Sequence, residues 1–475
     1  MKRIETSKGY SGLSLLLLAT ITLLVYSPVL WNDFLYYWDD QWVAINYFTE
    51  AGWTWNNLWR IFTEYYHGQY SPANELLYVL VYSIFGYSPS AFHSASLLLH
   101  VANVCLVFLC CRELLKANGK VKEERVTMIS FIAALLFAVN PMNVESIAWI
   151  SASKVLVYTF FYLLATYSYL QYLDRKKIGY YILTMFLFLW SFLGKEQAVT
   201  FPIWLLMILV LYKRNLKQWR PWLEVMPFLL LSLWFGFVTM LSQADFGGGF
   251  LSVQETYPLW QRIVLACYSL VEYATKFFIP YNLLYIYPFP MRVGEALPDW
   301  MLVYPALVLI FSAAFWKYLS RGVLAVGLTF FVIHIAVALH IIPLSRFSVI
   351  ADRYIYLASI GLAFIVSSYF VKLIMAVQGT VRKSLIVAGL IIALFLGAYS
   401  NMRCHDWKNT DTIKKEIREL LKQRDDYIPP EQFEKMMEED NIEEVSNNID
   451  PKGISLVLNK GQEDDLIKVY KKPIQ

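Results

Sequence analysis

The chain has 475 residues, of which 57% are hydrophobic and only 16% are charged, and its mean hydropathy is +0.44. This balance excludes a soluble enzyme of ordinary composition and predicts an all-α polytopic membrane protein. The formal net charge of +4 is small for this length, and we expect no nucleic-acid partner. Aromatic residues make up 17%, as is typical where rings lie at lipid–water boundaries.

The first apolar run extends from Leu13 to about Val29 and follows the basic residues Lys2, Arg3 and Lys8. A signal peptide has a similar pattern, but no small-x-small cleavage site follows this run. We therefore expect an uncleaved first transmembrane span.

Segments of about 20 apolar residues are long enough to cross a bilayer. Eleven follow one another along the chain: 12–30, 90–111, 126–142, 147–173, 179–195, 197–213, 221–243, 300–317, 322–343, 354–374 and 383–400. Two further segments, 73–87 and 259–282, are ambiguous. Pro72 precedes the first, and Glu272 and Lys276 interrupt the second.

The distribution of basic residues resolves this ambiguity. If neither segment crosses and the N-terminus is cytoplasmic, 20 of the 28 Lys and Arg residues before residue 401 lie on the inner side. This bias is the positive-inside pattern. We therefore expect about eleven transmembrane helices, interfacial helices in the first and fourth outer loops, and an extracytoplasmic C-terminus.

The end of the chain has a different composition, with 13 Lys and Arg and 17 Asp and Glu from residue 401 onward. We divide the chain into a transmembrane domain, 1–405, and a small soluble extracytoplasmic segment, 406–475. Charge spacing and the pair of prolines at 429–430 predict short helices at 411–424 and 431–440.

Ionisable residues gather on the expected outer side, beginning with Asp39 and Asp40 after the first span. One of them is suited to accept a proton from an acceptor hydroxyl, while its neighbour orients a sugar or a metal ion. A helix N-cap or a solvated pair is the alternative. The sequence does not show whether this loop is helical or extended, so either aspartate can be the base.

Three further outer positions carry charge. Glu145, in the short loop between spans three and four, is either a second acid of the same site or a solvated residue. Lys195, with Glu196 at the end of span five, departs from the charge pattern unless it holds an anion such as a lipid phosphate; pairing with an acid or snorkelling is the alternative. Arg353, at the head of span ten, is suited to phosphate or to headgroup anchoring.

Five motifs occur in a characteristic order. They are Trp38-Asp39-Asp40, the run 67–72 from His67 to Pro72, the run 137–145 that ends in Glu145, Gly194-Lys195-Glu196-Gln197, and the run 351–356 with Asp352-Arg353-Tyr354. Their order resembles that of GT-C glycosyltransferases over about residues 10–410, and most nearly that of the TMTC-type protein O-mannosyltransferases and their bacterial relatives.

The resemblance implies an enzyme that moves a sugar, mannose or another hexose or pentose, from a polyprenyl-phosphate carrier to a glycan, lipid or protein acceptor. Transfer occurs with inversion on the extracytoplasmic side, at a bacterial cell membrane or, in a eukaryote, the ER membrane. No cofactor is implied with certainty, and a divalent metal stays open. Membrane lipids are the other expected partner.

Carried over to this sequence, the resemblance makes Asp39 or Asp40 the base and Glu145 the second acid. The donor and lipid-phosphate site then contains Lys195, Glu196, Arg346, Arg353 and Tyr354. The sugar or acceptor pocket contains His67, Tyr70, His93 and Lys154. This chain has Asn140 and Asn143 where the family usually has histidines, and its tail is too short for three 34-residue repeats.

Two other classes of protein are compatible with the composition. A transporter or flippase of lipid-linked sugars is the main rival, but such proteins favour internal repeats and midplane sites, and the sequence shows no repeat. A scaffold whose acidic tail binds a partner is the third.

Overall fold

The computed structural model describes residues 2–36, 38–66, 68–117, 121–245, 257–291, 293–319, 322–341 and 348–415, with the pairs 456–457 and 468–469. Two predicted site residues, His67 and Arg346, lie outside the described residues. So do the predicted helix at 431–440 and most of the one at 411–424, of which residues 411–415 are helical.

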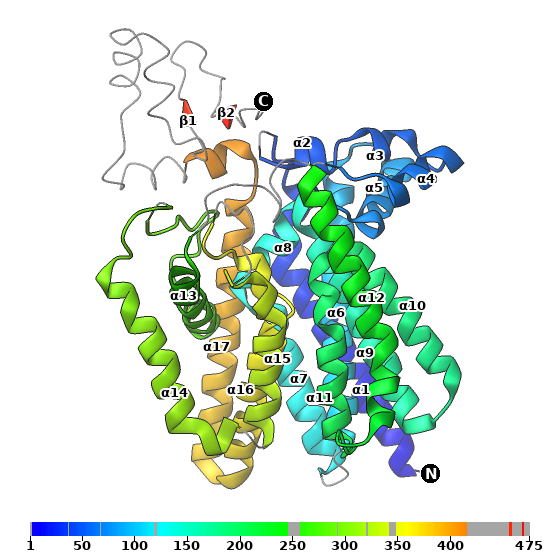
Figure 1. The fold of residues 1–475 in the computed structure, drawn as a ribbon. Helices are drawn as coiled ribbons and strands as arrows, with labels where there is room; N and C mark the ends of the chain where they lie inside the picture. The colour runs from blue at the N-terminus through cyan, green and yellow to red at the C-terminus, as the bar shows by residue number, and fades with distance from the viewer. Residues whose placement is uncertain are drawn as a thin grey trace.

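Most of the described chain forms helices that run side by side (Figure 1). They are α1 (Lys2–Tyr26), α6 (Pro89–Lys116), α7 (Glu123–Val139), α9 (Ser153–Arg175), α10 (Ile178–Gly194), α11 (Phe201–Leu211), α12 (Trp219–Asp245), α14 (Val303–Leu319), α15 (Gly322–Ile335), α16 (Ser359–Ala376) and α17 (Gly379–Asp406). Each of the eleven predicted spans overlaps one of these helices.

Within the described ranges, six helices are long and apolar enough to cross a membrane, or seven if α7 and the bent segment after it count as one span. Several of the others, such as α10 and α11, are apolar but shorter. The all-α, apolar architecture is therefore confirmed, whereas the number of eleven spans stays a prediction.

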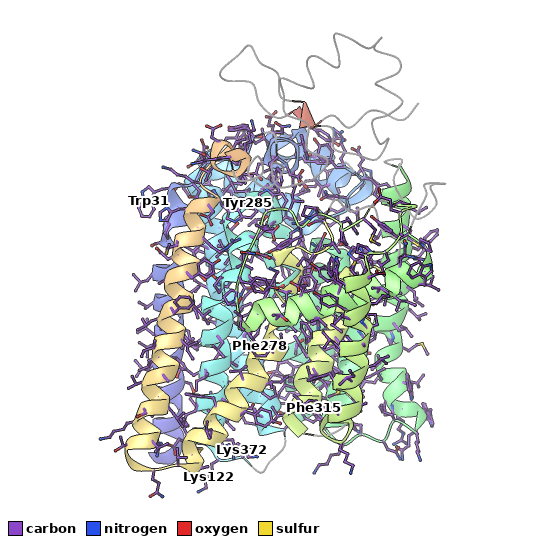
Figure 2. All side chains as sticks on the ribbon, turned by 90° about the vertical axis from the view of Figure 1, so that its left-hand side faces the viewer. Trp31, Lys122, Phe278, Tyr285, Phe315 and Lys372 are labelled. Carbon is purple, nitrogen blue, oxygen red and sulfur yellow. The ribbon has the colours of Figure 1, made fainter. Side chains whose placement is uncertain are left out.

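The bundle has two distinct ends (Figure 2). Lys122 and Lys372, both expected on the inner side, lie at the lower end, and Trp31 and Tyr285 lie at the upper end. This arrangement agrees with the predicted sidedness, although the side that faces the cytoplasm stays a prediction.

Four short helices form a layer at the upper end, between α1 and α6 in sequence (Figure 1). They are α2 (Asp40–Val43), α3 (Tyr47–Ala51), α4 (Trp55–Thr63) and α5 (Pro72–Phe85). The ambiguous segment 73–87 is thus a short helix of this layer. The other ambiguous segment forms α13 (Leu259–Phe278), which lies across the bundle, nearly end-on in Figure 1 and sideways in Figure 2.

The remaining elements are short. The 3₁₀ helices are η1 (Ser27–Trp31), η2 (Pro141–Asn143), η3 (Ile150–Ala152), η4 (Glu196–Thr200), η5 (Asp299–Leu302), η6 (Ala336–Ala338) and η7 (Asp352–Ile355); α8 is Val144–Ala148. Strands β1 (Leu456–Val457) and β2 (Lys468–Val469) pair antiparallel, with Leu456 opposite Val469.

Two buried hydrophobic clusters meet at the segment after α7. The larger cluster is built mainly from α1, α6, α7, α9 and α11, and it includes Val144. The second is built mainly from α13, α15 and α16, and it includes Met142. The candidate site lies at this junction, where the chain cannot continue as an uninterrupted helix.

Candidate active site

The break after α7 places Glu145 inside the protein. Pro141 has no backbone N–H to continue a helix, and the side chain of Asn140 accepts a hydrogen bond from Met142 N at 3.0 Å. The Asn143 side chain donates to Phe137 O at 2.7 Å. The chain therefore bends by 55° and continues as α8, in which Glu145 is only 1% exposed. The alternative of a solvated loop acid is wrong.

Glu145 holds Arg353, although the two residues are 208 positions apart. The backbone N–H of Arg353 donates to Glu145 Oε2 at 2.7 Å, and its guanidinium forms an ion pair with Oε1. The guanidinium also lies 5.1 Å from the ring of Trp149 and 4.9 Å from that of Tyr354. Arg353 and Tyr354 belong to η7, before α16 begins at Ser359, so their expected place at the head of a span is corrected.

Lys195 is a buried cation beside this pair. It is 4% exposed, and the described residues offer its ammonium no hydrogen-bond acceptor or ion pair. Its Nζ lies 5.2 Å from the ring of Tyr354. Gly194 permits this position, because a Cβ there would come within 3.0 Å of the Tyr158 backbone. An ammonium without an acceptor is costly to bury unless an anion binds it.

The charged side chains that act on Lys195 are those of Glu196, Lys154 and Arg353. Lys154, in the first turn of α9, donates to Gln69 Oε1 at 2.6 Å. Lys195, Glu196, Arg353 and Tyr354 therefore lie close together, and their role in donor binding stays a prediction. We call Asp39, Glu145, Lys154, Lys195 and Arg353 the charged cluster.

The two aspartates have different surroundings in the structure. Asp40 is fully buried, and it accepts hydrogen bonds from Leu35 N (2.9 Å), Ser151 N (2.9 Å) and Ser151 Oγ (2.5 Å). Burial raises the pKa of Asp40 to about 6. Asp39 is at the N-cap position of α2 but makes no capping hydrogen bond with its side chain. It is half-buried and interacts electrostatically with Arg353.

The other predicted pocket residues are less clearly grouped. Tyr70 donates to Phe62 O at 2.9 Å, close to the upper layer. His93 lies in α6, fully buried, and neither ring nitrogen has a hydrogen-bond partner. No contact joins these two side chains in the described part of the chain, so their shared pocket stays a prediction. No group of three or more His, Cys, Asp or Glu side chains that could hold a metal ion occurs among the described residues.

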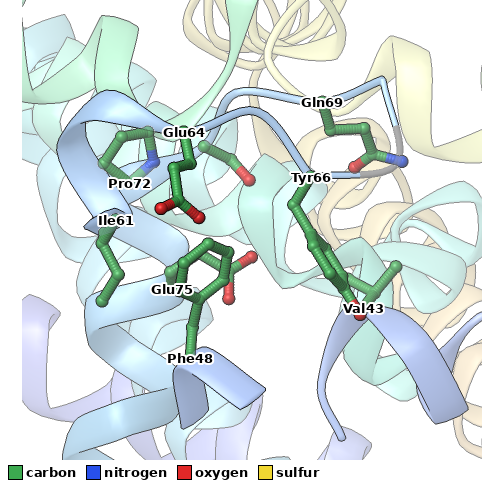
Figure 3. A pocket seen from close by; sticks show the side chains of 9 residues that line it. Val43, Phe48, Ile61, Glu64, Tyr66, Gln69, Pro72 and Glu75 are labelled. Atoms are coloured by element: carbon green, nitrogen blue, oxygen red, sulfur yellow. The ribbon is translucent and has the colours of Figure 1, made fainter. Parts of the chain in front are cut away.

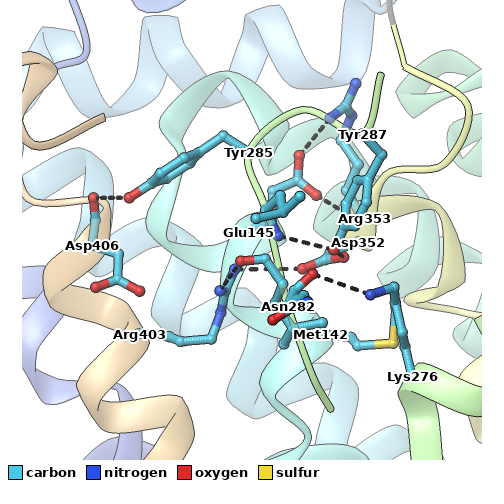
Figure 4. A network of polar contacts seen from close by, with 12 residues as sticks. Met142, Glu145, Lys276, Asn282, Tyr285, Tyr287, Asp352, Arg353, Arg403 and Asp406 are labelled. Atoms are coloured by element: carbon cyan, nitrogen blue, oxygen red, sulfur yellow. Dashed lines mark hydrogen bonds and ion pairs between the residues drawn. The ribbon is translucent and has the colours of Figure 1, made fainter. Parts of the chain in front are cut away.

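A second polar network adjoins the charged cluster (Figure 4). Its Asp352 belongs to the last of the five motifs, but the motif analysis did not identify its partners Lys276, Tyr287 and Arg403. Asp352 accepts a hydrogen bond from Tyr287 Oη at 2.6 Å and pairs with Arg403 of α17 at 3.4 Å. Lys276 of α13 donates to Tyr281 O and Asn282 O at 2.8 and 3.1 Å. We call Lys276, Tyr287, Asp352 and Arg403 the Asp352 network. For Lys276 and Arg403, the signal in the sequence was a charge inside or just after an apolar segment.

The residues after α17 also pack against the site. Trp407 is fully buried, stacks on Trp149 with ring centroids 5.9 Å apart, and meets Tyr285 at 4.7 Å. Asp33 N donates to Lys408 O at 2.8 Å. The beginning of the predicted C-terminal segment is therefore joined to the helical bundle.

Comparison with known proteins finds similarity to protein O-mannosyl-transferases. Tmtc1 of Drosophila melanogaster is 34% identical over 134 residues, which are 28% of this chain and 15% of that protein. TMTC1 of Homo sapiens is 27% identical over 205 residues, 39% of this chain and 22% of that protein. TMTC1 of Mus musculus is 28% identical over 205 residues, 39% of this chain and 20% of that protein.

No family model and no solved structure matches the chain. The matched stretches span about a fifth of the length of the curated relatives. Together with the apolar helices, the relatives support an integral membrane protein. The chain is thus similar, over part of its length, to the TMTC-type protein O-mannosyl-transferases, and the resemblance predicted from its motifs is confirmed.

Proposed function

We propose that the chain is a membrane glycosyltransferase that moves a sugar from a polyprenyl-phosphate carrier to an acceptor hydroxyl, with inversion at the anomeric carbon. The observation that carries this proposal is the buried side chain of Lys195, which has no hydrogen-bond acceptor among the described residues and lies beside Arg353 and Glu196. The similarity to O-mannosyl-transferases supports sugar transfer and suggests mannose and a protein acceptor.

Lys195 and Arg353, with Lys154 close by, bind the phosphate of the donor. The C–O bond between the sugar and this phosphate breaks, and its electron pair leaves with the phosphate oxygen. Cations that are already in place stabilise the charge that develops there, at little cost in reorganisation. Glu145 fixes the direction of the Arg353 guanidinium, so that its remaining N–H groups face the donor.

Asp39 is the base in this proposal. An acceptor oxygen attacks the anomeric carbon from the face opposite the phosphate, and Asp39 takes the hydroxyl proton as the new glycosidic bond forms. Asp40 is unsuited to this step because three donors already occupy its carboxylate. It holds the loop that carries Asp39 against η3, which makes it a positioning residue.

The upper end of the bundle is then the extracytoplasmic side. Trp31 and Tyr285 lie at this end, opposite Lys122 and Lys372. Asp39 of the charged cluster directly precedes α2, a helix of the upper layer. A site at one edge of the bundle suits a donor whose phosphate lies at the lipid headgroups and whose prenyl chain lies in the bilayer. A transporter would more commonly bind its substrate near the midplane.

The proposal is tested by incubating the purified chain in lipid vesicles with a panel of radiolabelled polyprenyl-phosphate sugars. The native chain transfers label from one donor to an acceptor. The Asp39→Asn variant loses about 10²- to 10⁴-fold in rate, as expected for a general base, and Asp40→Asn loses less. Label that crosses the membrane without a new product would contradict the proposal and favour the flippase.

A further inference from the structure

The upper layer contains a cavity (Figure 3), and no residue of the charged cluster lines it. Its walls come from α2, α3, α4, α5 and the chain between α4 and α5. The residues that matter here are Val43, Phe48, Glu64, Tyr66, Gln69 and Glu75. Neither Glu64 nor Glu75 was identified from the sequence as a site residue.

Two contacts connect this cavity to the proposed reaction centre. Gln69, on its wall, accepts the hydrogen bond from Lys154 of the charged cluster at 2.6 Å. Val43 is the last residue of α2, a four-residue helix that begins directly after Asp39. A ligand in the cavity therefore lies between the helix that follows the proposed base and a cation of the proposed phosphate site.

Glu75 is the unusual side chain of the cavity. It is only 8% exposed, its Oε2 accepts one long hydrogen bond from Asn46 at 3.3 Å, and its Oε1 accepts none within the described residues. Burial raises the pKa of Glu75 to about 7. A largely buried carboxyl group with a single long hydrogen bond favours a further donor from a ligand or from water.

The second carboxylate of the cavity is already neutralised. Glu64 pairs with Arg60 at 2.8 Å and accepts a hydrogen bond from Tyr47 Oη at 3.2 Å. The side chains that line the cavity include no Lys or Arg, so nothing in its wall compensates an incoming negative charge. The accessible space of the cavity is about 20 Å³, room for one hydroxyl group or one water molecule, so only the hydroxyl end of an acceptor can enter it.

We propose that this cavity is the acceptor subsite and that it selects an aliphatic hydroxyl on an uncharged group, with Glu75 accepting a hydrogen bond from the acceptor and disfavouring anionic acceptors. This inference rests on the proposed function and adds the acceptor class to it. The hydroxyl can come from a Ser or Thr side chain or from a sugar, and the experiment below distinguishes these sources.

The test uses the full chain in lipid vesicles with the donor identified in the panel above and measures two rates. The first is release of the sugar to water without an acceptor, which needs the donor site but not the acceptor cavity. The second is transfer to three probes: a neutral threonine peptide, the same peptide with Asp on both sides of the threonine, and methyl α-mannoside.

The native chain prefers the neutral peptide to its Asp-flanked form by about tenfold or more in kcat/KM. Glu75→Gln reduces this preference severalfold, while sugar release to water stays within about twofold of native. Tyr66→Leu raises KM for the neutral acceptor by roughly threefold to tenfold and retains the charge preference. Glu50→Gln and Tyr65→Leu, in the same layer but outside the cavity, are the matched controls.

The outcomes separate the two proposals. If the native chain neither releases nor transfers sugar, the proposed function fails and the acceptor subsite fails with it. If sugar release is normal but the native chain accepts both peptides equally, or both variants match their controls, the acceptor subsite alone is overturned. Transfer to the peptide but not to the mannoside assigns the hydroxyl to Ser or Thr, and the reverse assigns it to a sugar.

Discussion

The charged cluster and the Asp352 network lie side by side, yet they differ in how their charges are satisfied. In the network, Asp352 has Tyr287 and Arg403 as partners, and Lys276 donates to two carbonyl oxygens. In the cluster, Lys195 is equally buried but has no acceptor among the described residues. The charges of the network are satisfied by the fold itself, whereas we propose that a bound anion satisfies those of the cluster.

The same contrast divides residues that are neighbours in sequence. Asp352 belongs to the network and Arg353 to the cluster. Asp40 is enclosed by three donors, whereas Asp39 faces the charge of Arg353. Asp352 and Asp40 each hold their segment of the chain in place, and this fixes the orientation of the neighbouring Arg353 or Asp39 side chain. This division predicts that substitutions in the cluster mainly reduce activity and that those in the network mainly reduce stability.

The largest effect is expected at Lys195. Lys195→Met removes a cation that would stabilise the leaving phosphate, so kcat/KM for sugar transfer falls by about 10²- to 10³-fold. The free energy of unfolding stays the same or rises, because a buried charge without an acceptor is lost. Initial rates and detergent-based unfolding curves measure the two quantities.

Lys372→Met is the matched control, since Lys372 is exposed at the opposite end of the bundle. It leaves transfer unchanged. Equal rates for native protein and Lys195→Met would remove Lys195 from the site, and a large loss of stability in Lys195→Met would assign it to the fold.

The next effect is expected in the Asp352 network and concerns stability. Arg403→Met leaves the buried Asp352 carboxylate without its cation, which costs roughly 3–5 kcal/mol of unfolding free energy. The double variant Asp352→Asn/Arg403→Met recovers part of this loss, because no unpaired charge remains. A double variant less stable than Arg403→Met would show that the pair is not coupled in this way.

The smallest effect is a pH dependence from Asp40. Its pKa is about 6 in the folded protein and near 3.8 ordinarily, so between these values the folded state holds the proton more tightly than the unfolded chain. The stability from this group is fully present below about pH 4 and falls by up to about 3 kcal/mol as the pH rises through 6. The unfolding midpoint of native protein therefore falls more steeply over this range than that of Asp40→Asn. Parallel pH profiles would contradict this assignment.

The sequence predicted the parts that depend on local composition. Each of the eleven apolar segments overlaps a helix, and Lys122 and Lys372 lie at one end, as their charges indicated. The grouping of Glu145, Lys195 and Arg353 followed from the resemblance and from their common expected side.

The parts that depend on distant contacts were not predictable in this way. What distinguishes Asp40 from Asp39 is a hydrogen bond from Ser151, which lies 111 positions further along the chain. The burial of Glu145 depends on how Asn140 and Asn143 fold the break after α7, where hydropathy indicated only an ordinary loop. Glu75 and Arg403 each lie at the end of an apolar segment, a signal too general to mark a site.

The most direct test of the charged cluster is the binding of polyprenyl phosphate, the product that remains when the sugar has left. Native protein and Lys372→Met should bind it with the same affinity, weakening as salt is raised, whereas Lys195→Met should bind at least tenfold more weakly with little salt dependence. Equal affinity of all three proteins for polyprenyl phosphate would contradict the assignment of Lys195 to the donor phosphate and, with it, the proposed role of the cluster.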